Sequence, residues 1–322
     1  MKINLYRFEK WYFDILTENK DYLIMFFSLF EFMGFRLGFF VLDKGSFEKK
    51  DSDFKTFSTK LKILKRKGAT FLTDKGVIDI GKDTSSIDLT FNDMSIKVDI
   101  ASKSTLTHGI SGLYIKQNKW QYLNWKPLFL KYHITGNIKI KNTDLLIKKR
   151  KGYADYLTST IRPLKVPVKT LYWGRLHGEG FDLTYSYAEG NRKEAGWAAM
   201  IYHADNLSQQ LNILYLEPVD FEFLEESGIS CPTAYRMHGK NGSLEISLEV
   251  RHLKPAIFSS FSDIPSTPGK IGRSLTKKLL RDPRGGKFFS SVHIEITESG
   301  NKKIFDDLFM IDEYVKFLEN ED

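Results

Sequence analysis

The sequence has 322 residues, of which 48 are Lys or Arg and 40 are Asp or Glu, so the formal net charge is +8. Hydrophobic residues make up 42% of the chain and aromatic residues 14%, which is enough to build one large or two ordinary cores. This composition excludes a collagen-like or disordered chain. The single cysteine, Cys231, excludes an internal disulfide framework and a cluster of thiolate metal ligands.

Residues 1–20 carry charges throughout, among them Arg7, Glu9 and Asp14. A secretory signal peptide has an uninterrupted apolar stretch, and none follows these charges. Together with the single cysteine, this pattern predicts a cytoplasmic protein.

Residues 22–42 form the most apolar stretch of the chain and are long enough to span a bilayer. Glu31 and Arg36 interrupt that stretch, and each charge near the centre of a bilayer costs roughly 2.5–3.5 kcal/mol. We therefore expect no transmembrane segment and predict two strands joined near residues 32–36.

Most segments alternate between polar and apolar residues, as antiparallel strands with one buried face do. The alternation is clearest in residues 95–100, 137–141, 243–250 and 292–297. Turns are predicted at Asp43-Lys44-Gly45, Asp74-Lys75-Gly76 and Asn241-Gly242. Many short strands separated by such turns favour β-sandwiches or β-barrels.

Residues 304–318 are the main helical candidate, because their apolar residues approach a helical spacing. Pro163 and Pro167 interrupt the strand pattern and indicate a domain boundary. We therefore expect two domains, residues 1–165 and residues 166–322, and a short C-terminal helix.

Several common functional motifs are absent from the sequence. It contains no glycine-rich nucleotide-binding loop, no His-Glu-x-x-His sequence and no Gly-x-Ser-x-Gly sequence. The seven histidines are scattered without metal-ligand spacing, so we expect neither a metal nor a cofactor. Basic residues are spread along the chain and partly offset by acidic stretches, so nucleic-acid binding is not expected.

Two parts of the sequence match short motifs of a known family. The first is residues 9–14, Glu-Lys-Trp-Tyr-Phe-Asp, and the second comprises residues 151–155, 162–164 and 171–177. Together they resemble the bacterial carotenoid 1,2-hydratases (hydroxyneurosporene synthases) and the AttH-like proteins. The similarity covers roughly residues 8–200.

The resemblance implies an all-β protein of two lipocalin-like antiparallel β-barrel or sandwich domains. Related proteins include tocopherol cyclases and the lipocalin-like Diels–Alderases of polyketide pathways, which act on long apolar molecules, generally without a cofactor. This sequence has Lys10 and Ala154 where the family usually has Trp and His.

Glu9, Trp11 and Phe13 alternate along a predicted strand and therefore share one face. If that face points inward, the aromatic rings surround the carboxyl group, which raises its pKa and keeps a proton available for catalysis. The alternative is a structural ion pair between Glu9 and a basic residue inside the barrel.

Asp155 alternates with Tyr153 in the same way, which places a phenol beside a carboxyl group. A protonated Asp155 would donate to an alkene, and the faces of Tyr153 and Trp173 would stabilise the resulting cation. Arg175 and His177 share a face and would bind a carbonyl or phosphate group; the alternative for Arg175 is a structural ion pair.

These observations lead to two expectations for function. The first is a cofactor-independent enzyme that hydrates or cyclises a hydrophobic isoprenoid- or polyketide-like substrate, with Asp155, Tyr153 and Glu9 as catalytic residues. Trp11, Trp173, Arg175 and His177 are then expected to bind the substrate. The second is a non-catalytic protein that binds a lipid or another small hydrophobic molecule. A structural or interaction protein with filled barrels is a further alternative.

Overall fold

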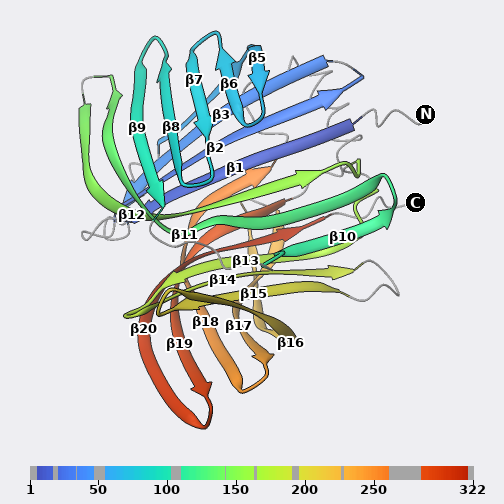
Figure 1. Ribbon diagram of the computed structural model, residues 1–322. Helices are drawn as coiled ribbons and strands as arrows, with labels where there is room; N and C mark the ends of the chain where they lie inside the picture. The colour runs from blue at the N-terminus through green and yellow to red at the C-terminus, as the bar shows by residue number, and fades with distance from the viewer. Residues whose placement is uncertain are drawn as a thin grey trace. The chain divides into compact units, whose positions relative to one another are not determined.

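A computed structural model of the chain describes residues 6–16, 21–33, 35–46, 55–102, 110–141, 143–162, 165–190, 196–225, 228–260 and 284–317. Within these ranges the regular elements are all β-strands, and every strand pair is antiparallel (Figure 1). The chain forms two compact units, one of residues 1–106 and 118–160 and the other of residues 107–117 and 161–322. The chain thus enters the second unit first at residues 107–117, returns to the first unit, and passes into the second unit again at residue 161.

The first unit is built on one antiparallel sheet. In chain order its strands are β1 (Tyr6–Leu16), β2 (Asp21–Phe32), β3 (Phe35–Ser46), β4 (Lys55–Leu61), β5 (Ile63–Lys67), β6 (Thr70–Thr73), β7 (Gly76–Ile80), β8 (Thr84–Thr90), β9 (Met94–Ser102), β11 (Gln121–Ile140) and β12 (Thr143–Ser159). The spatial order is β4-β3-β2-β1-β12-β11-β9-β8-β7-β6-β5, and the sheet nearly closes on itself. Most of β10 (Leu113–Asn118) belongs to the second unit.

The apolar stretch of residues 22–42 forms the hairpin of β2 and β3, in which Phe32 pairs with Phe35. The prediction of two strands joined near residues 32–36 is confirmed. No helix in the described part of the chain has the length and apolar character needed to cross a membrane.

The turn predicted at Asp43-Lys44-Gly45 is wrong, because these residues continue β3. Gly45 lies opposite Tyr22 in the neighbouring strand. A Cβ atom at Gly45 would lie 2.1 Å from the Tyr22 hydroxyl oxygen, so only glycine leaves room for that ring. The glycine reflects close packing between strands rather than a change of chain direction.

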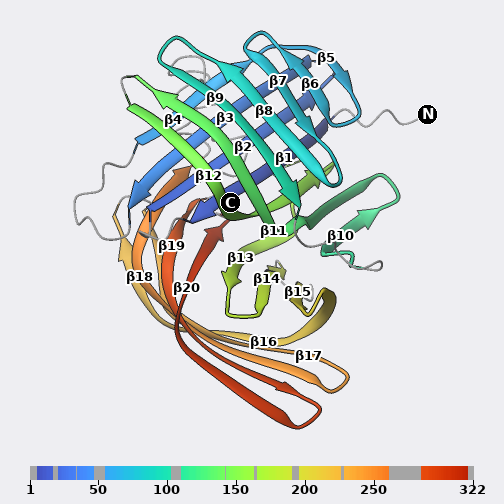
Figure 2. The same cartoon turned by 60° about the vertical axis from the view of Figure 1, so that its left-hand side comes forward.

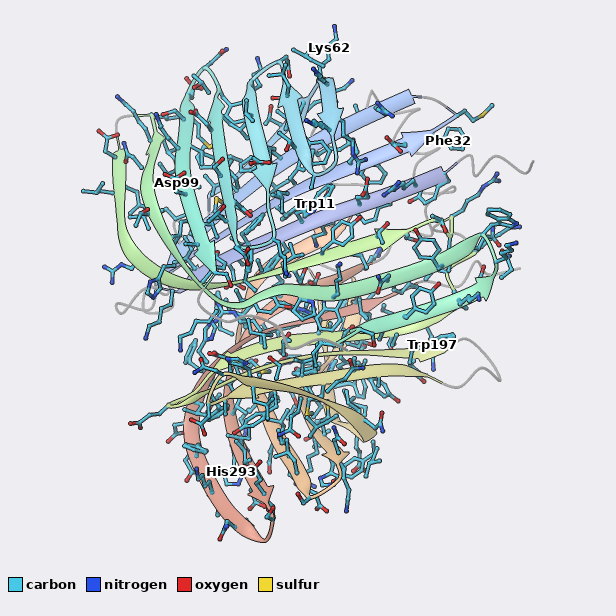
Figure 3. The ribbon with its side chains drawn as sticks, viewed as in Figure 1. Trp11, Phe32, Lys62, Asp99, Trp197 and His293 are labelled. Atoms are coloured by element: carbon cyan, nitrogen blue, oxygen red, sulfur yellow. The ribbon has the colours of Figure 1, made fainter. Side chains whose placement is uncertain are left out.

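The core of the first unit lies on the inner face of its sheet. Trp11, Phe13 and Ile15 of β1 point into this core, as their alternation predicts. Trp11, labelled in Figure 3, stacks on Phe27 of β2 at 5.3 Å and meets Phe71 of β6 edge-on at 5.0 Å. Large aromatic residues from strands far apart in sequence therefore fill the space inside the sheet.

The second unit is a closed barrel of eight strands in chain order. They are β13 (Val168–His177), β14 (Phe181–Gly190), β15 (Trp197–Ala204), β16 (Leu207–Leu224), β17 (Ile229–Asn241), β18 (Leu244–Ser260), β19 (Arg284–Glu298) and β20 (Asn301–Lys316). Its core includes Tyr172, whose ring centre lies 5.5 Å from that of Tyr235 and 5.0 Å from that of Tyr314. The prediction of an all-β protein with two barrel-like sheets is confirmed.

The C-terminal helix predicted for residues 304–318 is wrong, because β20 occupies this segment. Phe305, Leu308 and Met310 all face the barrel core, which gives steps of three and then two residues. The step of three spans a β-bulge, where Ile294 pairs with Phe305 but Val292 pairs with Leu308. A bulge inside a strand thus produced an apolar spacing that resembles a helix.

Candidate functional site

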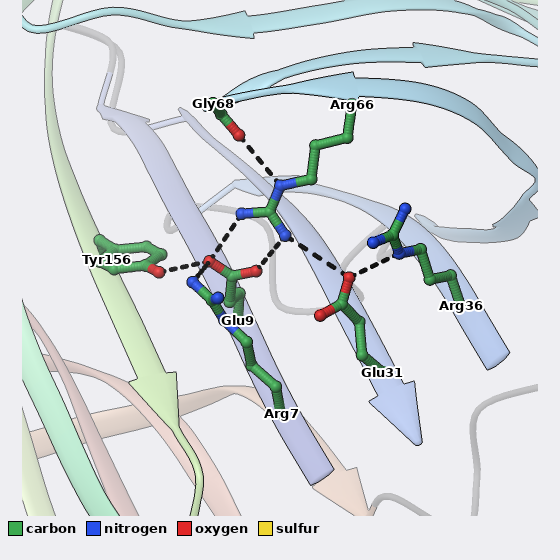
Figure 4. A network of polar contacts seen from close by, with 7 residues as sticks. All are labelled: Arg7, Glu9, Glu31, Arg36, Arg66, Gly68 and Tyr156. Atoms are coloured by element: carbon green, nitrogen blue, oxygen red, sulfur yellow. Dashed lines mark hydrogen bonds and ion pairs between the residues drawn. The ribbon is translucent and has the colours of Figure 1, made fainter. Parts of the chain in front are cut away.

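Glu9 lies at the centre of a network of charged groups inside the first unit (Figure 4). Its side chain is only 1% exposed, and its two oxygen atoms accept hydrogen bonds from the Arg66 guanidinium at 2.6 and 3.0 Å. Arg7 also donates to Glu9 at 2.9 Å, and the Tyr156 hydroxyl donates at 2.6 Å. The paired contacts from Arg66 fix the orientation of the carboxylate as well as its charge.

The network continues from Arg66 to further groups. The Arg66 Nε donates to the Gly68 carbonyl oxygen at 3.0 Å, and its Nη1 lies 3.8 Å from a Glu31 oxygen. Glu31 accepts a hydrogen bond from Arg36 at 2.7 Å. The guanidinium of Arg66 also lies 5.0 Å from the centre of the Phe71 ring. Arg66 is therefore held by contacts on several sides.

The pKa of Glu9 contradicts the role expected from its sequence context. Burial by itself raises the pKa of this carboxyl group. Hydrogen bonds from Arg66 and Tyr156, with the charges of Arg66 and Arg7, outweigh that effect and hold the pKa of Glu9 below its usual value. Glu9 is therefore an ionised partner of two arginines and does not keep a proton available. This matches the structural ion pair that the sequence allowed as the alternative to a catalytic role.

Asp155 and Tyr153 lie together on the other face of the same sheet. Ala154, between them in sequence, belongs to the inner core, so its neighbours on β12 point away from that core. The Tyr153 hydroxyl donates to Asp155 Oδ2 at 3.2 Å, and the Trp125 indole Nε1 donates to the same oxygen at 3.1 Å. A phenol and an indole thus hold one carboxyl oxygen.

This geometry defines what Asp155 can do chemically. Because Oδ2 accepts two hydrogen bonds, the two donors fix the orientation of the Asp155 carboxyl group. The Tyr12 ring lies 6.4 Å from the Tyr153 ring, so aromatic surface flanks the carboxyl group. Ala154 points to the opposite face, and a histidine at that position would therefore not reach Asp155 along this strand.

Trp173, Arg175 and His177 lie on one face of β13 in the second unit. Tyr172 and Leu176 face the barrel core, so these three residues occupy the opposite, outer face of the strand. The Lys287 Nζ lies 4.8 Å from the centre of the Trp173 ring. His177 Nδ1 lies 2.7 Å from Asp182 Oδ1. The predicted sharing of one face by Arg175 and His177 is therefore confirmed.

A polar cluster that the sequence did not indicate lies inside the second barrel. Asp312, which is 1% exposed, accepts hydrogen bonds from Ser290 at 2.5 Å and from Tyr235 at 3.0 Å. His252 Nε2 lies 2.7 Å from the same carboxylate, and the Tyr185 hydroxyl bonds to that of Tyr235. Burial raises the pKa of Tyr185 and Tyr235 well above the usual value, so both phenols stay protonated.

The predicted site residues thus occupy distinct places. Glu9 and Trp11 lie inside the first unit, whereas Tyr153 and Asp155 lie on the outer face of the same sheet. Trp125, the second donor to Asp155, was not among the predicted site residues. Within the described ranges, no three His, Cys, Asp or Glu residues come together to hold a metal ion.

A groove of about 520 Å³ lies on the first unit, lined by residues of strands β7, β8, β9 and β11. Asp79, Ser86, Asp99 and His133 are among its lining residues. None of the residues predicted to act in catalysis or binding lines this groove, so it does not enlarge the Asp155 site.

Comparison with known proteins places the chain by its fold. No family model and no curated protein matches the sequence. A solved structure of a Nitrosomonas europaea protein assigned to AttH has a TM-score of 0.62 and 12% identity, covering 97% of this chain and 93% of that one.

Two further solved structures extend the likeness. CghA with bound Sch210972 has a TM-score of 0.61 and 9% identity, covering 97% of this chain and 89% of that one. Kievitone hydratase from Nectria haematococca has a TM-score of 0.57 and 9% identity, covering 96% and 88%. This chain shares its fold along almost its whole length with the AttH, CghA and kievitone hydratase structures. The resemblance to AttH-like proteins that the short motifs predict is therefore confirmed at the level of the fold.

Proposed function

We propose that the protein is an enzyme that hydrates or cyclises a hydrophobic isoprenoid- or polyketide-like substrate without a cofactor. Diels–Alder-type cyclisation is included in this proposal. The observation that carries it is the Asp155 carboxyl group, held by Tyr153 and Trp125 and flanked by aromatic rings. The shared fold with kievitone hydratase, and with CghA in complex with a small molecule, supports the reaction class.

In the hydration reaction Asp155 acts first as an acid and then as a base. Its carboxyl proton passes to one carbon of an alkene, and the π electrons form the new C–H bond. Water adds to the cationic carbon and returns a proton to the carboxylate, which restores Asp155. In a cyclisation, a second alkene or a hydroxyl group of the substrate replaces the water.

Other residues have supporting roles in this proposal. Tyr153 and Trp125 orient the carboxyl group through their hydrogen bonds to Oδ2. The Tyr153 ring, beside Asp155 on the same face of β12, stabilises positive charge on the substrate. Glu9 supports the first barrel through Arg66, as its ion pairs indicate, rather than donating a proton.

The test compares Asp155→Asn with a matched control, Asp99→Asn, which removes an exposed carboxylate from the same unit. The proteins are incubated with isoprenoid polyenes and prenylated phenols in heavy-oxygen water, and products are identified by mass spectrometry. Asp155→Asn should lower turnover by roughly 10²-fold or more, while the control retains it. Equal turnover by Asp155→Asn and the wild type would refute the catalytic assignment.

A second candidate function is non-catalytic binding of a small hydrophobic molecule. The observation that favours it is the fixed carboxyl group of Asp155, which is equally able to accept a hydrogen bond from a ligand hydroxyl. In that case an apolar molecule should copurify with the protein and remain chemically unchanged. Asp155→Asn should then weaken ligand retention, and no candidate substrate should be converted.

A further inference from the structure

Strand β16 loses its partner on one side halfway along its length. The pairing of β15 with β16 begins where Ala204 lies opposite Leu207 and ends where Met200 lies opposite Leu211. On the opposite edge, residues 212–224 of β16 pair with β17, and the two strands run side by side in Figure 2. Among the strand pairs of the described residues, none uses the β15-side edge of β16 beyond Leu211. This part of β16 therefore presents backbone donors and acceptors along an open edge.

The open edge carries large apolar side chains in solvent. Leu214, Tyr215, Phe221 and Phe223 are 59%, 50%, 54% and 60% exposed. Glu222, which lies between the two phenylalanines, pairs with the core residue Cys231 and therefore lies on the inner face of the strand. Because adjacent residues of a strand point to opposite faces, the rings of Phe221 and Phe223 point to the outer face of the barrel. Single exposed apolar residues are common, but four on one stretch of strand with an open edge indicate an interaction surface.

The charge of this stretch differs from that of the chain as a whole. Residues 212–224 include Glu217, Asp220 and Glu222, all exposed, and no Lys or Arg, although the chain has a net charge of +8. Arg236 of β17 lies opposite Glu217, and its Nε lies 3.8 Å from a carboxylate oxygen of Glu249, so this arginine has an acidic neighbour outside β16 as well. An occupant of this edge should therefore be basic as well as apolar.

The same charges disfavour two other occupants. A second copy of the chain paired through this edge would place the acidic residues of one β16 beside those of the other. A membrane with anionic lipids would repel the three carboxylates. Pro218, which lacks a backbone N–H, further limits indiscriminate pairing with other strands.

We propose that the open edge of β16, residues 212–223, binds an extended peptide segment of another protein in which Lys or Arg alternates with apolar residues. The segment adds as a strand and forms main-chain hydrogen bonds with β16. Its apolar side chains cover Phe221 and Phe223 on the outer face. Its basic side chains lie near Asp220 and Glu222, which alternate with the two rings.

The experiment measures binding of a fluorescent ten-residue peptide of alternating lysine and valine by anisotropy. Two control peptides carry glutamate in place of lysine, or proline at every valine. The wild-type protein should bind the Lys/Val peptide, with a dissociation constant that rises with salt. Neither control should bind, because one has the wrong charge and the other cannot form the ladder.

Protein variants assign the binding to this edge. Glu217→Lys with Glu222→Lys, and separately Phe221→Ser with Phe223→Ser, should each weaken binding roughly tenfold or more. Glu179→Lys, an exposed charge reversal elsewhere in the second unit, is the matched control and should bind as the wild type does. Circular dichroism and melting curves confirm that each variant is folded.

Three results would overturn the proposal. Equal binding of the Lys/Val peptide and both control peptides by the wild-type protein would show that the contact is non-specific. Unchanged binding by the Glu217→Lys, Glu222→Lys variant would place the peptide elsewhere. Concentration-dependent dimerisation that Phe221→Ser with Phe223→Ser abolishes would identify a second copy of the chain as the occupant.

Discussion

Replacing Glu9 with Gln should destabilise the first unit more than any exposed charge substitution. The change removes the negative charge between Arg66 and Arg7 but keeps the size of the side chain. Removing one partner of a buried ion pair costs about 3–5 kcal/mol. Arg7 is 44% exposed and Arg66 18% exposed, so water can solvate part of the unpaired charge. We therefore expect a loss of about 3 kcal/mol, at the lower end of that range.

The assay is urea-induced unfolding followed by tryptophan fluorescence, since Trp11 packs in the same core as this network. Glu31→Gln is the matched control, with the same chemical change in a carboxyl group that is 23% exposed. Its bond to the exposed Arg36 should contribute no more than about 1 kcal/mol. The difference between the two variants isolates the effect of burial.

The pKa of Glu9 gives this prediction a pH dependence of known sign. Its pKa in the folded protein lies below the ordinary value of 4.5, so its contribution to stability is complete above pH 4.5. The contribution is lost as the pH falls through the lower, folded-state pKa. The stability gap between the wild type and Glu9→Gln should therefore narrow at acidic pH.

Two outcomes would refute this reasoning. If Glu9→Gln costs no more free energy of unfolding than Glu31→Gln, the buried network does not contribute as its geometry indicates. If the gap between Glu9→Gln and the wild type widens below pH 4.5, the direction of the pKa shift of Glu9 is wrong.

Further predictions concern single positions. Gly45→Ala should destabilise the first unit by roughly 1–3 kcal/mol in urea unfolding, because the new Cβ collides with the Tyr22 ring; an unchanged midpoint would contradict the close packing. Asp312→Asn should lower the stability of the second barrel by about 3 kcal/mol, because its donors lose a charged acceptor; a stabilised variant would contradict this role. Burial raises the pKa of Cys231 to about 12, so iodoacetamide should modify it at pH 8 only in denaturant, and rapid labelling of the native protein would refute its burial.

The sequence pattern predicted which residues share a face of a strand. Alternation placed Trp11 and Phe13 in one core and Tyr153 beside Asp155, and the structure confirms both. This success has a simple cause, because adjacent residues of a strand point in opposite directions whatever the rest of the fold.

The sequence could not predict which strands bring their residues together. Arg66 binds Glu9 from 57 positions away, and Trp125 reaches Asp155 through the register of β11 with β12. Such contacts depend on strand order and bulges, which local alternation does not encode. Asp312 likewise draws its donors from several strands of the second barrel.

The position of β1 has a consequence for the order of folding during synthesis. β1 lies between β2 and β12, and its register with β12 joins Phe8 to Ser159. Such a pairing closes a loop of roughly 150 residues, and long loops slow the formation of native contacts. The first unit should therefore complete its sheet only when about half of the chain has been translated. Until then Trp11 and Phe13 lack one neighbouring strand, and chaperones that bind exposed aromatic segments have time to engage the nascent chain.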